Sequence, residues 1–195
     1  PHPCEDGCNR SQKDGSVAIN NVERFIGDWG LERKLALPRL NGDGPFEEKI
    51  AVVGSGPSGL SCAYQLARRG YKVTVFEAFD KPGGMLRYGI PPYRLPREVI
   101  DGEVQRILDM GVEARMNTRV GRDIGFAQLE QDYDAILLAI GAQQGRTLNI
   151  PGGDAPNCVS GVAFLAADQY VVAFELAAVV LTVALAAAGY IARRR

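Results

Sequence analysis

Three glycines and one carboxylate have the types and spacing that could bind the pyrophosphate and a ribose of a dinucleotide. Gly54, Gly56 and Gly59 form G-x-G-x-x-G within "VVGSGPSGL", and Glu77 follows in "VTVFEA". In this pattern the first glycine allows a tight turn, the second lets the backbone approach a pyrophosphate, and the third lets a helix pack on a strand. The N-terminus of that helix offers unpaired N–H groups to the phosphates. Glu77 can accept hydrogen bonds from ribose hydroxyls, and it would repel a 2′-phosphate.

The glycine pattern has this meaning only between a strand and a helix, and the flanking residues predict both. "KIAVV" at 49–53 is a short apolar run typical of a buried strand, and 58–69 has a helical pattern that Gly70 ends. "YKVTVFEA" at 71–78 predicts a second strand of β-branched and aromatic residues. Dinucleotide binding is therefore favoured over a merely structural glycine turn, but Glu77 does not by itself separate FAD from NAD.

The remaining elements extend an α/β pattern. After loop-like residues 1–15, a helix is expected from 17 to about 35, and Pro and Gly make 36–48 a linker. Later patterns predict helices at 97–110 and 126–132 and strands at 112–116 and 134–140. We expect a partial helical domain at 1–40, a linker at 41–48, a Rossmann-like α/β domain at 49–165 and a separate tail at 166–195.

Charge and cysteine content limit the partners and the compartment. The formal net charge is -1, with 22 basic and 23 acidic residues, so the basic field that nucleic acid requires is missing. Four cysteines are few for a disulfide scaffold, and the polar start of the chain does not resemble a signal peptide. We expect no nucleic-acid partner and a cytoplasmic location for the domain.

Several separated motifs occur in the order that a known family shows. They are "GPSGL" at 56–60, "PGG" at 82–84, "YGIPPYRLP" at 88–96 and "IPGGD" at 150–154. Residues 3–165 resemble the FAD-binding part of the glutamate synthase small chain and of its relatives, which include the flavin half of dihydropyrimidine dehydrogenase. The resemblance implies that FAD occupies the first dinucleotide site and passes electrons from NAD(P)H to iron-sulfur centres. It also implies an electron-transfer partner subunit, and the chemistry would belong to the flavin, so no catalytic acid or base is assigned.

The resemblance also implies which residues bind FAD. The expected cofactor-binding residues are Gly54, Gly56, Pro57, Ser58, Gly59, Glu77, Gly84, Leu86, Arg94, Val120 and Gly141. Arg94 has an equally reasonable interpretation as part of a solvated loop between two prolines. One departure is that the Ala-Thr-Gly common in such flavoproteins is Ala139-Ile140-Gly141 here, so that no hydroxyl is supplied.

Two cysteines near the start of the chain could be metal ligands. Cys4 and Cys8 in "HPCEDGCNR" lie four residues apart, and the family that this chain resembles carries iron-sulfur clusters in a helical N-terminal domain. A 4Fe-4S cluster normally needs four thiolates. The ligand set in this stretch is therefore incomplete, and further ligands would come from elsewhere. Cys62 is expected to be a buried core residue, and Cys158 has no assigned role.

Relatives with this resemblance continue into a second Rossmann unit that binds NADPH and then return to complete the flavin site. No second G-x-G-x-x-G follows in this sequence. The expectation is an incomplete FAD module without its NADPH-binding unit.

The tail has the composition of a membrane-spanning helix. Residues 170–191 carry one charged side chain, Glu175, and would form about 33 Å of helix at roughly 1.5 Å per residue. Tyr170 and Tyr190 suit the interfaces, and 193–195 are arginines that suit a cytoplasmic end. The alternative is a buried apolar helix of a soluble core. A cytoplasmic end for the arginines would place the flavin domain outside, which conflicts with the polar N-terminus.

A second resemblance bears on that conflict. "FELAAVVLTVALAAAGY" at 174–190 is similar to the last helix of subunit J of NADH-quinone oxidoreductase. The alternative function is therefore a membrane-anchored accessory subunit, or a fusion of two fragments, with a vestigial flavin domain.

Overall fold

A four-stranded parallel sheet forms the centre of this computed structural model, which describes residues 2–40, 44–142, 150, 151, 153, 155, 156, 158 and 159. The strands are β1 (Lys49–Val53), β2 (Lys72–Phe76), β3 (Glu113–Arg115) and β4 (Ala135–Leu138). Their order is β3-β2-β1-β4, and all three neighbouring pairs are parallel. The glycine loop therefore follows a central strand, between the ends of its two neighbours.

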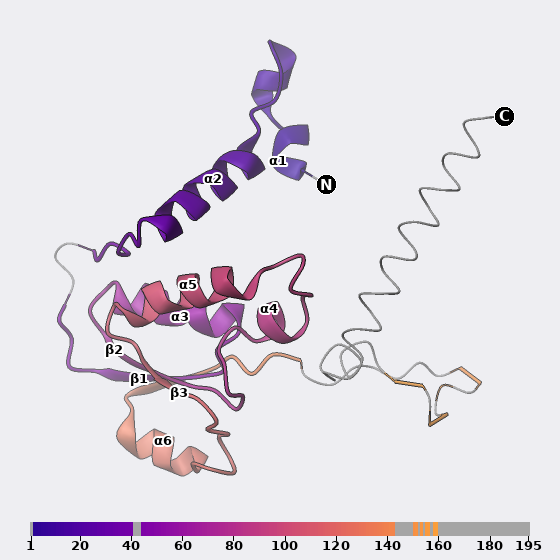
Figure 1. Ribbon diagram of the computed structural model, residues 1–195. Helices are drawn as coiled ribbons and strands as arrows, with labels where there is room; N and C mark the ends of the chain where they lie inside the picture. The colour runs from indigo at the N-terminus through magenta and orange to yellow at the C-terminus, as the bar shows by residue number, and fades with distance from the viewer. Residues whose placement is uncertain are drawn as a thin grey trace.

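Helices cover both faces of this sheet (Figure 1). Helices α3 (Pro57–Ala67) and α5 (Arg97–Leu108) lie on one face, and α6 (Phe126–Asp132) lies on the other. The short α4 (Met85–Tyr88) precedes α5. The expected α/β Rossmann-like fold is confirmed.

Alternation along β1 and β2 explains why two layers of helix are needed. Val52 packs with α3 residues on one face, whereas Val53 and Phe76 pack on the α6 residue Leu129 on the other. Both strands have four buried residues after an exposed lysine, so neither face of these strands can be left to solvent. A third cluster joins α3 to α5 and consists of Leu60, Ile100 and Val104.

The N-terminal residues differ from the expected loop. They form α1 (Pro3–Asp6) and a 3₁₀ turn η1 (Asn9–Gln12) before α2 (Ile19–Glu32). The loop prediction for 1–15 was wrong because Pro3 occupies the first helical turn and Glu5 and Asp6 complement the positive end of the helix dipole. The expected longer helix is present as α2, and its apolar side chains Val22, Phe25, Ile26 and Trp29 are exposed.

The segment that joins α2 to β1 is held against the Rossmann unit by hydrogen bonds. The Arg39 guanidinium donates to the carbonyl oxygen of Ala67 at 3.1 Å and to that of Met110. Arg106 on α5 donates to the carbonyl oxygen of Leu35 at 2.9 Å. The described part of the predicted linker, 44–48, has no helix or strand, yet Phe46 stacks on Tyr71 with ring centroids 4.5 Å apart.

The expected membrane-spanning helix at 170–191 lies outside the described residues. Among the helices that the structure does describe, none is long and apolar enough to cross a bilayer.

Candidate dinucleotide-binding site

Gly54 makes the turn at the end of β1 and cannot be replaced without a clash. Its φ is +106°, and a Cβ built there would lie 2.3 Å from the carbonyl oxygen of Ala139, just after β4. The Gly54 N–H donates to the carbonyl oxygen of Phe76 at 2.8 Å, which continues the β1–β2 ladder by one residue. The absence of a side chain therefore lets three chain segments meet at this point.

The other two glycines of the motif set the position of helix α3. A Cβ on Gly59 would lie 1.9 Å from the carbonyl oxygen of Gly54, so only a residue without a side chain lets α3 pack this closely on the turn. Gly56 has extended backbone and precedes the first residue of α3. A Cβ built on Gly56 would have one neighbour, the Cα of Gly84 at 4.0 Å. The N-terminus of α3 is therefore open to a ligand.

A second glycine pair forms the opposite wall. Gly83 and Gly84 have φ of +122° and +52°, and a Cβ on Gly84 would lie 2.7 Å from the Cα of Gly56. The Gly83 N–H donates to the carbonyl oxygen of Ser55 at 2.9 Å. The "PGG" motif is thus packed backbone to backbone on the glycine loop.

A buried arginine holds this second loop in place. Arg87 is 6% exposed; its Nε donates to the carbonyl oxygen of Pro82 at 2.6 Å, and its Nη2 pairs with Asp101 on α5. Arg97 donates to the carbonyl oxygen of Leu86 at 3.2 Å, and burial together with the nearby Arg87 lowers the pKa of Arg97. Helix α5 therefore fixes the loop through two guanidinium groups.

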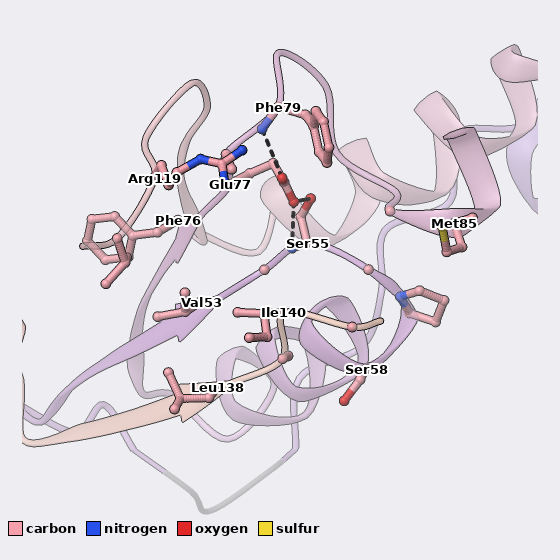
Figure 2. Close-up of a pocket in the computed structure, with 18 of the residues that line it drawn as sticks. Val53, Ser55, Ser58, Phe76, Glu77, Phe79, Met85, Arg119, Leu138 and Ile140 are labelled. Carbon is pink, nitrogen blue, oxygen red and sulfur yellow. Dashed lines mark hydrogen bonds between the residues drawn. The ribbon is translucent and has the colours of Figure 1, made fainter. Parts of the chain in front are cut away.

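Glu77 lies at the end of β2 and is 6% exposed. Its Oε2 accepts hydrogen bonds from the Ser55 N–H at 2.9 Å and from the Ser55 hydroxyl, and its Oε1 accepts one from the Phe79 N–H at 2.9 Å. Figure 2 shows these three bonds at the end of the two central strands. The carboxylate is thus oriented by the protein itself.

These elements enclose a cleft of about 960 Å³ at the carboxyl ends of the strands. Its lining is mainly apolar side chains and bare backbone, and Figure 2 shows Val53, Leu138 and Ile140 on the side opposite Glu77 and Phe79. In open parallel sheets ligands bind outside the carboxyl ends of the strands, which is where this cleft lies. A cleft of this size suits a small-molecule cofactor.

Most of the residues expected from the sequence line this cleft. Those that do are Gly54, Gly56, Pro57, Ser58, Glu77, Gly84, Val120 and Gly141. Gly59 lies beneath the glycine loop, Leu86 packs on the cluster between α3 and α5, and Arg94 is exposed in the turn before α5. The structure does not bring these three residues to the cleft surface.

Other lining residues were not anticipated. Ser55, Phe79, Met85, Thr118 and Arg119 all line the cleft. Ser55 occupies a variable position of the glycine motif, so only its full burial reveals its importance. Thr118 and Arg119 follow β3, and their place could have been found from the rule that parallel strands end at the same edge.

The two candidate metal ligands lie in the N-terminal segment, away from this cleft. Cys4 is exposed, Cys8 is partly exposed, and both are free thiols. Hydrogen bonds from the backbone at Val17 and Arg10 lower the pKa of the Cys8 thiol. Within the described residues, no group of three or more His, Cys, Asp or Glu side chains is arranged to hold a metal ion.

The fold and the cleft define a Rossmann-type dinucleotide-binding unit. The family model described as an NAD(P)-binding Rossmann-like domain matches residues 52–115, which run from β1 through β3. The chain therefore contains a Rossmann-like domain of this class.

More particular similarities come from whole proteins. The chain is 40% identical over 157 residues to the glutamate synthase [NADPH] small chain of Bacillus subtilis, covering 79% of this chain and 31% of that protein. It is 39% identical over 145 residues to the NAD-dependent dihydropyrimidine dehydrogenase subunit PreT of Salmonella typhimurium, covering 74% of this chain and 35% of that protein. The resemblance that the motifs indicated is confirmed.

A solved structure supports the same fold. FprA from Mycobacterium tuberculosis, in complex with NADPH, superposes with a TM-score of 0.57 at 31% identity, covering 61% of this chain and 28% of that one. The chain spans about a quarter to a third of the length of the curated relatives it matches.

Proposed function

We propose that the Rossmann-like domain, 49–165, binds FAD and serves as the flavin module of an NAD(P)H-dependent oxidoreductase of the glutamate synthase small-chain type. In this function electrons pass from NAD(P)H through FAD to iron-sulfur centres. The observation that carries the proposal is the oriented, buried Glu77 beside an open helix N-terminus, in one cleft at the ends of parallel strands. The similarity to oxidoreductases that use pyridine nucleotides supports it.

The residues present fit FAD at this cleft. Gly56 and Gly84 meet at bare backbone where a pyrophosphate would pass, and the N-terminus of α3 would face its negative charge. Glu77 would hold the adenosine ribose, and its charge disfavours a 2′-phosphate there. NADPH is thus assigned to a different place as the electron donor, as in full-length relatives.

FAD supplies the redox chemistry when bound. The chain's own residues would bind and orient it: the glycine loop holds the phosphates, Arg87 keeps the second loop against that loop, and apolar side chains exclude water from the cleft. No described side chain is assigned a proton-transfer role.

A visible absorption spectrum tests this function. The full chain, purified in detergent, is incubated with FAD and freed of unbound flavin; we expect a protein-bound flavin spectrum that NADPH bleaches when the electron-donor site is supplied by a partner. Gly56→Ala is the informative variant, because its backbone is extended and its only neighbour is 4.0 Å from the new methyl, so the fold should persist while the pyrophosphate is blocked.

Gly27→Ala on α2 is the matched control, since nothing lies within 4 Å of that Cβ. A colourless wild-type protein, or equal flavin content in the wild type and Gly56→Ala, would overturn the proposal.

We also propose that Cys4 and Cys8 are two ligands of a 4Fe-4S cluster whose other ligands come from outside the described residues. The lowered pKa of Cys8 supports this role, because the thiolate is the form that binds iron. Reconstitution with iron and sulfide, together with a partner that supplies the remaining ligands, should give a broad absorption band that Cys8→Ser removes and Cys62→Ser leaves. A band that survives Cys8→Ser would contradict the assignment.

The apolar composition of 170–191 favours a second candidate, a membrane-anchored accessory subunit. The chain should then remain in the membrane fraction after an alkaline wash, and Leu181→Arg should release it, because a charge near mid-membrane is costly. Flavin-free protein that copurifies with respiratory membrane subunits would favour this second function over the first. Recovery of the wild-type chain in the washed supernatant would rule out the anchor.

A further inference from the structure

The acceptor positions of Glu77 are mostly filled by the protein. An ionised carboxylate offers about two acceptor positions on each oxygen. Oε2 receives both the N–H and the hydroxyl of Ser55, and Oε1 receives the N–H of Phe79. One acceptor position therefore remains, and it belongs to Oε1.

Ser55 is the residue that decides this arrangement. It is 0% exposed, and all three of its polar groups are hydrogen-bonded. Its N–H and its hydroxyl donate to Glu77, and its carbonyl oxygen accepts from the N–H of Gly83. Without the hydroxyl, Oε2 would keep a single donor, and the carboxylate could rotate so that either oxygen faces the cleft. Ser55 thus connects the ribose end of the cleft to the second glycine loop.

We propose that Ser55 is a positioning residue that leaves Glu77 one open acceptor, so that the cleft recognises one hydroxyl of the adenosine ribose and not both. This inference rests on the proposed function in that it requires an adenosine diphosphate group in the cleft. It goes beyond that function because it assigns a role to Ser55 and limits the selectivity that Glu77 can provide.

Three soluble probes test the inference on the full chain: ADP, 2′-deoxy-ADP and 3′-deoxy-ADP, each titrated by calorimetry. A hydrogen bond to a charged acceptor predicts that one deoxy nucleotide binds about tenfold or more weakly than ADP. The other should bind within about twofold of ADP, since its missing hydroxyl has no acceptor on Glu77. Equal weakening of both deoxy nucleotides, or no weakening of either, would overturn the proposal.

Ser55→Ala separates a positioning role from a structural one. Without the Ser55 hydroxyl, Oε2 and Oε1 of Glu77 each have one free acceptor position. We therefore expect this variant to bind both deoxy nucleotides more weakly than ADP, with the difference between the two deoxy nucleotides reduced to about twofold. A purely structural residue would weaken all three probes by one common factor, and that result would overturn the role of Ser55. Ser61→Ala, an exposed serine on α3 outside the cleft, is the matched control.

Glu77→Gln supplies a second variant should Ser55→Ala not fold. Its side chain has the same shape, but its NH2 group must face either the Ser55 donors or the Phe79 N–H, so the selectivity should be lost. The wild-type probe series by itself still decides whether one acceptor is open. In the double variant, Ser55→Ala should change ADP affinity no further than Glu77→Gln alone does.

The outcomes also separate this inference from the proposed function. If FAD binds but the three ADP probes do not differ, the inference fails and the flavin function stands. If the probes differ as expected while FAD does not bind, the flavin function fails and the inference stands. If neither FAD nor ADP binds, both are wrong.

Discussion

At the scale of single residues, backbone conformation constrains this site more strongly than side-chain chemistry does. Gly54, Gly83 and Gly84 all have positive φ. At Gly54 and Gly84, another part of the backbone lies so close that an added Cβ would clash with it. Most L-residues adopt this region only at a cost of about 1–2 kcal/mol, before any clash is counted. Substitution at these positions therefore tests the geometry directly.

Gly54→Ala should destabilise the chain by about 3 kcal/mol or more, as measured by urea unfolding. Its Cβ would meet the Ala139 carbonyl oxygen in addition to the strain of the positive φ. Gly121→Ala is the matched control, because Gly121 has φ of +91° but nothing within 4 Å of its Cβ, and it should cost only about 1–2 kcal/mol. Equal losses in the two variants would show that the contact with Ala139 contributes nothing.

The pH dependence of alkylation distinguishes two cysteines of the same chain. Backbone hydrogen bonds from Val17 and Arg10 lower the pKa of Cys8 from 9.0, whereas burial raises that of Cys62. Because the thiolate is the reactive form, the rate at Cys8 should reach half its maximum below pH 9 and that at Cys62 above it. Peptide mass spectrometry after iodoacetamide pulses measures both sites at once, and a reversed order would refute this prediction.

At the scale of elements, α5 positions the cleft although none of its residues lines it. Arg87 connects the Pro82 carbonyl oxygen to Asp101 on α5, and Arg97 connects α5 to the carbonyl oxygen of Leu86 in α4. The exposed aromatic Phe79 is held in turn by Tyr88 of α4, with ring centroids 4.7 Å apart. The wall of the cleft formed by 78–85 is therefore supported from outside by side chains.

Arg87→Met should lower the free energy of unfolding by about 2 kcal/mol or more, because the Pro82 carbonyl oxygen would lose a charged donor in a buried setting. Flavin or ADP affinity should fall as well, since Gly84 would no longer be held on Gly56. Arg122→Met, which removes an exposed pair with Asp123, should leave both measurements unchanged. Unchanged stability in Arg87→Met would show that the second glycine loop keeps its conformation without Arg87.

Local sequence patterns were enough to predict many of the helices and strands. Strand 49–53 and its glycine loop follow from a short apolar run and three glycines, and the described strand has the same limits. The one-turn α4 was not predicted, because it is too short for a helical period and depends on the two glycines before it. Ser55 was missed because its role depends on Glu77 and on the second glycine loop, which only folding brings next to it. Arg119 could have been placed at the cleft from the order of the parallel strands.

At the scale of the whole molecule, arginine side chains bonded to carbonyl oxygens help to join the N-terminal segment to the Rossmann unit. Arg39 and Arg106 both bond to backbone groups of a segment distant in sequence. By contrast, most apolar side chains of α2 are exposed, and only Ile19 and Leu31 are partly buried. The attachment therefore combines a few directional bonds with limited apolar contact.

Arg39→Ala should reduce the free energy of unfolding by about 1–3 kcal/mol, the usual range for hydrogen bonds that involve a charged group. Amide hydrogen exchange should increase at Leu40 and Phe46, whose N–H groups bond to Arg68 and Gly70 beside the Arg39 contact. Arg24→Ala, on the exposed surface of α2, is the control and should change neither measurement. Unaltered exchange at both amides would show that Arg39 does not hold the segment.

The sheet order also has a consequence for protein synthesis. β1 pairs with β2, which follows it closely along the chain, but also with β4, which comes much later. A ribosome therefore releases the glycine loop and Glu77 long before Leu138 and Ala139, which complete the cleft. Until then the turn at Gly54 lacks its neighbour on one side, and the apolar edge of β1 is open to other chains. The nascent chain should thus depend on chaperones most during the interval between the emergence of β2 and that of β4.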